Sequence, residues 1–178
     1  MKPPALPAAT TFTLAGSGPT SWWHTAVRVL EHIPHSLIAL LARFSIAAVF
    51  WNSGQTKIEG FVLNLVTGDV ALGWPRLSES AVALFQDEYK LPLLAPALAA
   101  PLAAFAEHLF PLLLLIGLGT RLSALALLGM TLVIQVLVYP GAYATHGTWA
   151  AVLLFLITRG PGAWSVDHWL AHRHASGA

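Results

Sequence analysis

A single carboxylate stands in the middle of an apolar segment that is long enough to cross a membrane. Glu107 lies within residues 97–118, where its neighbours are almost all leucine, alanine and phenylalanine. A charge near the centre of such a segment costs at least about 2.5 kcal/mol on insertion scales. We therefore expect Glu107 to be paired inside a helix bundle, either to hold helices together or to handle protons, ions or a redox ligand.

Arg43 is the partner that helix spacing predicts for Glu107. Counted from the same end of two antiparallel helices, Arg43 lies about seven residues in and Glu107 about eleven, an offset of about 6 Å along the helix axis. An arginine side chain reaches that far, so we predict a buried Arg43–Glu107 ion pair. Two interpretations stay open: the pair is catalytic, or it only fixes helix register.

A second polar group is predicted near the opposite membrane face. It consists of Lys57, Gln135, His146 and Trp149. The first three offer hydrogen-bond donors to a quinone carbonyl or an anionic substrate, and the tryptophan offers an aromatic wall. We name these four as cofactor-binding candidates. The alternative is that they are ordinary interfacial residues, with the lysine snorkelling to the surface.

The C-terminal histidines raise the question of a metal site. His168 and His172 are four residues apart, and Asp167 and His174 lie close by. The same stretch also fits an interfacial helix that begins at Ser165. We favour the helix and predict no metal site.

The composition is that of a membrane protein. Of 178 residues, 56% are hydrophobic and 10% are charged, where soluble domains carry roughly 25% charged residues. The chain has no cysteine, which excludes disulfides, thiol redox centres and cysteine-ligated iron–sulfur clusters. The net charge is +1 without a long basic block, so we expect membrane lipid, and no nucleic acid, as a partner.

Four apolar segments predict membrane-spanning helices, at residues 36–57, 97–118, 121–139 and 143–158. The turns between the last three are very short, so these helices must be antiparallel neighbours. The predicted fold class is an all-α membrane protein. It is a four transmembrane helix bundle with short interfacial helices at both termini and in the external loop.

Residues 1–35 are predicted to form a cytoplasmic N-terminal segment, with an interfacial helix capped by Ser21. The transmembrane domain is predicted over residues 36–158, followed by a cytoplasmic tail over 159–178. Lysine and arginine are more frequent on the side of the termini, which places both termini in the cytoplasm of a bacterial-type inner (plasma) membrane.

The predicted external loop covers residues 58–96. Ser78 or Ser80 predicts the N-cap of a short amphipathic helix that extends through Tyr89. Such a helix in a long loop is either functional or a cover over the mouth of the bundle.

Several strings occur in an order that resembles the DoxX family of small four-helix membrane proteins. They are FWNSGQTKIEGF, FQDEYKLPLLAP, AAFAEHLFPLLLLIGLGTRLSAL, MTLVIQVLVYP and HGTWAAVLLFLITRGPGAWSVD. The resemblance covers residues from about 37 to 167. The positions that match the family's charged pattern are Arg43, Lys57, Glu107 and Arg121.

The resemblance implies a membrane subunit of a quinone-linked oxidoreductase or of a redox- or stress-related complex. Related proteins include the membrane-embedded part of a thiosulfate:quinone oxidoreductase. It implies a quinone as cofactor and a soluble or membrane oxidoreductase subunit as partner. A homo-oligomer stays open, as does whether the chain is itself an enzyme. The alternatives are a non-catalytic scaffold or assembly partner and, less favoured, a small proton-linked transporter.

Overall fold

The computed structural model describes residues 19–64 and 67–175, and the chain divides into two compact units, Met1–Ile33 and Pro34–Ala178. The first unit contains α1 (Pro19–Glu31), on which Trp22 and Trp23 are exposed. The helix begins two residues before the predicted cap at Ser21, because proline is well suited to the first turn of a helix. The remaining helices all belong to the second unit.

Four long helices confirm the predicted membrane spans. They are α2 (His35–Gln55), α4 (Pro96–Ile116), α5 (Thr120–Val133) with its π-helical continuation η2 (Ile134–Val138), and α6 (Tyr143–Arg159) with the preceding 3-10 turn η3 (Pro140–Ala142). With these extensions each span has 19 to 21 residues and is apolar enough to cross a membrane. The protein is therefore an all-α membrane protein. The fourth span is longer than predicted because η3 adds a turn at its start.

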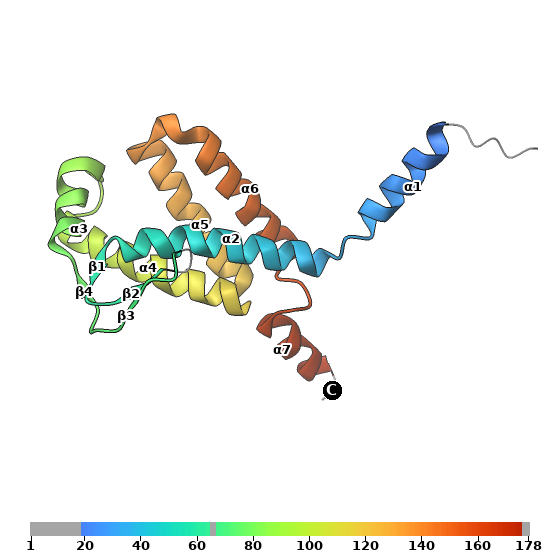
Figure 1. The fold of residues 1–178 in the computed structure, drawn as a ribbon. Coiled ribbons are helices and arrows are strands. Elements are labelled where there is room, and N and C mark those ends of the chain that lie inside the picture. The colour runs from blue at the N-terminus through green and yellow to red at the C-terminus, as the bar shows by residue number, and fades with distance from the viewer. Residues whose placement is uncertain (1–18, 65–66, 176–178) are drawn as a thin grey trace, which may run out of the picture. The chain divides into compact units, whose positions relative to one another are not determined.

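The four spans close into a bundle. Helix α5 packs against both α4 and α6, which confirms the predicted antiparallel neighbours, and α2 packs between α4 and α6. Figure 1 shows α2 and α4 running side by side. The core between the spans includes Phe50, Leu114, Leu127 and Leu153. We call the end where α2 begins and α6 ends the terminal face, and the opposite end the loop face.

The loop between α2 and α4 carries two small antiparallel ladders and a short helix. Strand β1 (Ile58–Glu59) pairs with β4 (Arg76–Leu77), and β2 (Val62–Leu63) pairs with β3 (Val70–Ala71). The sequence did not predict these strands, because two-residue strands are too short to show an alternating pattern.

The short helix of the loop is α3 (Glu79–Leu84), continued by the π-helical turn η1 (Phe85–Tyr89). Of the two predicted caps, Ser78 and Ser80, it is Ser78 that caps the helix, because its hydroxyl accepts a hydrogen bond from the amide of Ala81 at 3.1 Å. Its buried face packs on the start of α4, where Ala81 and Phe85 meet Ala99 and Ala100. The helix therefore covers part of the loop face.

The C-terminal helix α7 (Val166–Ala175) begins where Ser165 predicts it. The Ser165 hydroxyl accepts a hydrogen bond from the amide of His168 at 3.2 Å. Asp167, which the sequence placed near the histidines, instead accepts hydrogen bonds from the amides of Gly119 and Thr120. Its carboxylate thus caps the start of α5 and ties α7 to the bundle.

Candidate functional site

A buried polar cluster joins α2 to α4 within the bundle. The Lys57 ammonium lies 2.7 Å from Glu107 Oε2, and each side chain is 3% exposed. Lys57 also donates to the carbonyl and the hydroxyl of Ser53, at 3.2 and 3.1 Å. The Ser53 hydroxyl in turn donates to Glu107 Oε1 at 3.2 Å. We call these three residues the Lys57 cluster.

Gly54 allows α4 to approach α2 closely at this cluster. A Cβ atom added at Gly54 would lie 2.8 Å from Cε1 of His108 and 3.0 Å from Cβ of Glu107. Both contacts are shorter than ordinary van der Waals distances, so any larger residue would push the helices apart. The absence of a side chain at Gly54 therefore brings Glu107 within reach of Ser53 and Lys57.

The predicted Arg43–Glu107 ion pair is wrong. The buried Arg43 guanidinium donates instead to three backbone carbonyls, those of Leu114, Leu115 and Trp164. Two of these carbonyls belong to the last turn of α4, where the helix itself leaves carbonyl groups without partners. Arg43 therefore holds the end of α4 and the connection to α7 at the terminal face.

The direction of helical side chains explains this difference. Side chains on a helix lean toward its N-terminus. Arg43 therefore points along α2 toward the terminal face and away from Glu107. Lys57 follows the last turn of α2, and the same lean turns its ammonium back into the bundle. Depth along the membrane normal alone suggested the wrong partner.

A second set of hydrogen bonds connects α4 to the loop. His108 Nδ1 lies 2.6 Å from the Ala104 carbonyl, and Nε2 lies 2.9 Å from the side-chain amide nitrogen of Gln55. A neutral imidazole with the proton on Nδ1 satisfies both contacts. The Gln55 side-chain oxygen accepts from the amide of Leu63 at 2.8 Å, which fixes β2 to the end of α2.

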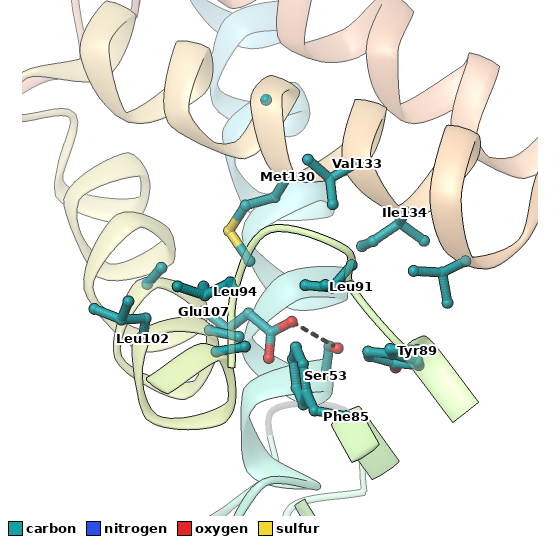
Figure 2. A pocket seen from close by; sticks show the side chains of 15 residues that line it. Ser53, Phe85, Tyr89, Leu91, Leu94, Leu102, Glu107, Met130, Val133 and Ile134 are labelled. Atoms are coloured by element: carbon teal, nitrogen blue, oxygen red, sulfur yellow. Dashed lines mark hydrogen bonds between the residues drawn. The ribbon is translucent and has the colours of Figure 1, made fainter. Parts of the chain in front are cut away.

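An apolar cavity of about 370 Å³ lies beside the Lys57 cluster. Apart from Ser53, Tyr89, Glu107 and Gly129, its lining consists of apolar side chains: Phe85, Leu91, Leu94, Ala99, Leu102, Ala103, Ala106, Met130, Val133, Ile134 and Val138. In Figure 2 the carboxylate of Glu107 lies between Met130 on one side and Phe85 on the other, with Ser53 hydrogen-bonded to it. The cavity therefore has one polar end in an otherwise hydrocarbon-like wall.

Two tyrosines meet near the loop-face side of this cavity. The Tyr139 hydroxyl donates to the carboxylate of Glu88, and the rings of Tyr89 and Tyr139 pack edge to face with centroids 5.9 Å apart. The hydrogen bond to Glu88 raises the pKa of Tyr139, and burial raises the pKa of Tyr89. Both phenols are therefore neutral at physiological pH, and they connect η1 to the end of η2.

The four cofactor-binding candidates do not form one group. Lys57 belongs to the cluster with Glu107, whereas His146 Nδ1 lies 2.7 Å from the side-chain oxygen of Gln135. The ring of Trp149 lies 5.1 Å from that of His146, between centroids. Gln135, His146 and Trp149 are therefore neighbours as expected, but none of these three described residues lines the apolar cavity.

The sequence did not single out Ser53 or Met130, and it placed Phe85 and Tyr89 only on the loop helix. Ser53 had a signal, because it precedes Lys57 by four residues and so lies on the same helical face. Phe85 and Tyr89 also had one, since they share the face of the loop helix that packs on the bundle. Met130 had none, because only the packed structure shows which apolar side chains line a cavity.

The comparisons with known proteins agree with the fold. The model of the DoxX family matches residues 38–140, which is more than half of the chain. That match includes α2 from residue 38 onward, the loop, α4 and α5, and thus every residue of the Lys57 cluster and of the apolar cavity. No curated protein matches the chain significantly. No solved structure does so either. The chain belongs to the DoxX family.

Proposed function

We propose that this protein is a membrane subunit of a quinone-linked oxidoreductase, and that the apolar cavity beside Glu107 binds the quinone. The observation that carries the proposal is the position of a buried, charge-paired carboxylate at one end of this cavity. An apolar pocket with a few converging polar groups is the usual form of a small-molecule site, and this volume lies within the usual range of about 300–1,000 Å³.

The lining fits a quinone chemically. A quinone ring and its hydrocarbon tail are apolar, as are Phe85, Leu102, Met130 and most of the wall. Its carbonyl oxygens need hydrogen-bond donors, and the Ser53 hydroxyl at the polar end of the cavity can supply one by turning from Glu107 Oε1 to the quinone. A quinone dissolved in the membrane would reach this cavity within the span region, because α4 and α5 both contribute to its walls.

The Lys57 cluster supports the proton chemistry of such a site. Reduction of a quinone to a quinol takes up two electrons and two protons. The Lys57 ammonium can pass a proton to the Glu107 carboxylate across the 2.7 Å contact, and the protonated Glu107 can then deliver it to a quinone oxygen as the electrons arrive. Lys57 then takes up a new proton from water at the loop face, and a second transfer along the same route completes the quinol. Since the chain has no cysteine for a thiol or iron–sulfur centre, we propose that a partner oxidoreductase subunit supplies the electrons.

The cavity changes the roles expected of the other candidates. Lys57 acts through Glu107 in this proposal, rather than by contacting the quinone. Arg43 is assigned no proton transfer, because its guanidinium is bound to carbonyl groups at the terminal face. Binding of a cofactor by Gln135, His146 and Trp149 stays a prediction. It would require a second site, because the cavity does not include these residues.

One observation favours a different class of function, a non-catalytic scaffold. The Lys57–Glu107 pair bridges α2 and α4 and is almost completely buried, as expected of a pair that fixes the register of two helices. In a scaffold, the replacement of both charges by apolar groups would leave assembly and phenotype intact. In a quinone-linked subunit, the same replacement would abolish activity of the complex.

Quinone binding tests the proposal directly. The probe is decylubiquinone, titrated into the full chain in lipid nanodiscs and measured by equilibrium dialysis. We expect saturable binding by the wild type and its loss in Met130→Trp, where an indole fills the cavity. Leu125→Trp is the matched control, since Leu125 lies on the same helix but is 55% exposed and outside the cavity.

Two outcomes would contradict the proposal. The first is the absence of saturable binding by the wild type, and the second is equal binding by both tryptophan variants. The double variant Lys57→Met/Glu107→Leu, which leaves neither charge buried without its partner, then separates the two functions in cells that contain the intact complex. Loss of quinone reduction supports the oxidoreductase subunit, and unchanged reduction supports the scaffold.

A further inference from the structure

A second, polar cavity of about 450 Å³ opens at the terminal face. Several spans meet there: α2 contributes its first residues, α5 its first turn and α6 its last residue. The polar side chains that line the cavity are His35, Ser36, Arg121, Arg159, Asp167 and His168. This composition differs from that of the apolar cavity beside Glu107, so the two cavities are suited to different kinds of ligand.

The charge of this second cavity is dominated by two arginines. Among the described residues, neither Arg121 nor Arg159 has a hydrogen bond or an ion pair, and both are exposed. Asp167 is the one acid in the lining. Its two carboxylate oxygens already accept the amides of Gly119 and Thr120, at 2.8 and 2.9 Å. The two guanidinium groups are therefore available to an anion from outside the chain.

The connection from α6 to α7 gives the cavity a fixed wall. The amide of Ala163 donates to the hydroxyl of Ser36 at 2.9 Å, which ties this connection to the start of α2. A Cβ atom added at Gly162 would lie 2.8 Å from the Cα atom of Ser36. One added at Gly160 would lie 3.4 Å from Nη2 of Arg121. The backbone therefore packs closely beneath Arg121 and against α2.

We propose that this cavity binds a phosphate ester that carries a net negative charge, either the headgroup of an anionic phospholipid or a free phosphate compound. Arginine is suited to this ligand because its planar guanidinium donates two parallel hydrogen bonds to phosphate oxygens. The position of the cavity along the membrane normal also fits a phosphate ligand. The span of 19 residues from Thr120 to Val138 is about 28 Å long at 1.5 Å per residue. Its first turn therefore lies near the level of lipid phosphates.

Competition between two lipids tests this proposal. The full chain in detergent is mixed with equal amounts of phosphatidylglycerol and phosphatidylcholine, and retained lipid is measured by native mass spectrometry. We expect the wild type to retain phosphatidylglycerol preferentially. The variant Arg121→Gln/Arg159→Gln should bind it at least about tenfold more weakly, since two charge-assisted hydrogen-bonding groups are lost.

Arg173→Gln is the matched control. It removes the same charge from α7, but the Arg173 guanidinium lies over the ring of Trp169, 3.9 Å from the centroid, and does not line the cavity. We expect this variant to retain phosphatidylglycerol as the wild type does. Because Arg121 and Arg159 are exposed, their replacement should leave the fold intact, and the wild-type lipid preference can be measured without any variant.

A calorimetric titration with inorganic phosphate distinguishes the two sources. Phosphate binding that depends on Arg121 and Arg159, without a preference between the lipids, assigns the cavity to a free phosphate compound. A preference for phosphatidylglycerol that depends on the same arginines assigns it to a lipid headgroup. Equal retention of both lipids together with no arginine-dependent phosphate binding would overturn the proposal, whatever the result of the quinone experiment.

Discussion

Lys57 and Glu107 form a buried ion pair between the end of α2 and the middle of α4, with 2.7 Å between Nζ and Oε2. Their attraction offsets the cost of removing both charges from water, but it does so only while both are present. Ser53 accepts from the lysine and donates to the carboxylate, so each charge of the pair also has a charge-assisted hydrogen bond to a neutral hydroxyl. Loss of either partner should therefore be far more damaging than loss of both.

Lys57→Met should destabilise the protein by about 3–5 kcal/mol, because it leaves the carboxylate of Glu107 buried without a counter-charge. The double variant Lys57→Met/Glu107→Leu should recover much of that loss. Unfolding in detergent by heat or denaturant, followed by circular dichroism, measures the free energies of the wild type, of Lys57→Met, of Glu107→Leu and of the double variant. A double variant that loses as much as the two single variants together would show that the pair is not coupled.

Arg43 and Glu107 should show no such coupling. The carbonyl of Leu114, which accepts from Arg43, lies seven residues beyond Glu107, or about 10 Å along α4. The effects of Arg43→Lys and Glu107→Gln on the free energy of unfolding should therefore add to within about 0.5 kcal/mol. An interaction energy well above that in the same double-mutant cycle would restore the direct pair that the structure excludes.

Gly54→Ala should destabilise the bundle by about 1–3 kcal/mol, because the new methyl group would overlap the ring of His108. Gly129→Ala is the matched control. A Cβ atom at Gly129, within α5, meets no heavy atom within 4 Å, so this change should be neutral or stabilising by up to about 1 kcal/mol. Equal stability of the two variants would contradict the close approach of α2 and α4.

The spans were predictable from the sequence because each is set by a long apolar run. The helix caps at Ser78 and Ser165 were predictable because each depends on a hydrogen bond between residues that are close in the sequence. Glu107 was recognised for the same reason, as a charge in hydrocarbon. Its partner was not, because the choice between Arg43 and Lys57 depends on the direction of two side chains. The cavity also could not be predicted, since it depends on how η1 and η2 pack against α4.

The contact between Tyr139 and Glu88 should weaken at alkaline pH. This hydrogen bond raises the pKa of Tyr139 above its usual value of 10.0. The folded protein then binds the phenolic proton more tightly than the unfolded chain does. The stability from this contact is therefore complete below about pH 10 and is lost as the pH rises toward the raised pKa.

Tyr139→Phe tests this pH dependence. The free energy of unfolding of the wild type should fall between about pH 8 and about pH 11 by more than that of the variant, because the variant lacks the titrating phenol. Tyr143→Phe is the control, since Tyr143 is an exposed side chain on α6. A pH dependence that is the same in the wild type and in Tyr139→Phe would contradict the role of this contact.

Asp167→Ala should loosen the attachment of α7 to the bundle. The carboxylate accepts two amides at the start of α5, and the loss of such a cap costs about 0.5–2 kcal/mol. Because Asp167 lies 47 residues from Thr120 in the sequence, loss of the carboxylate also removes a tertiary link between α7 and α5. The variant Asp167→Asn keeps one acceptor oxygen and should have an intermediate effect. Limited proteolysis in detergent should cut the Asp167→Ala variant between α6 and α7 faster than the wild type.

Asp69→Ala is the control, since Asp69 is exposed in the loop and accepts from the hydroxyl of Thr67. Equal rates for the two alanine variants would show that the carboxylate of Asp167 does not hold α7 in place.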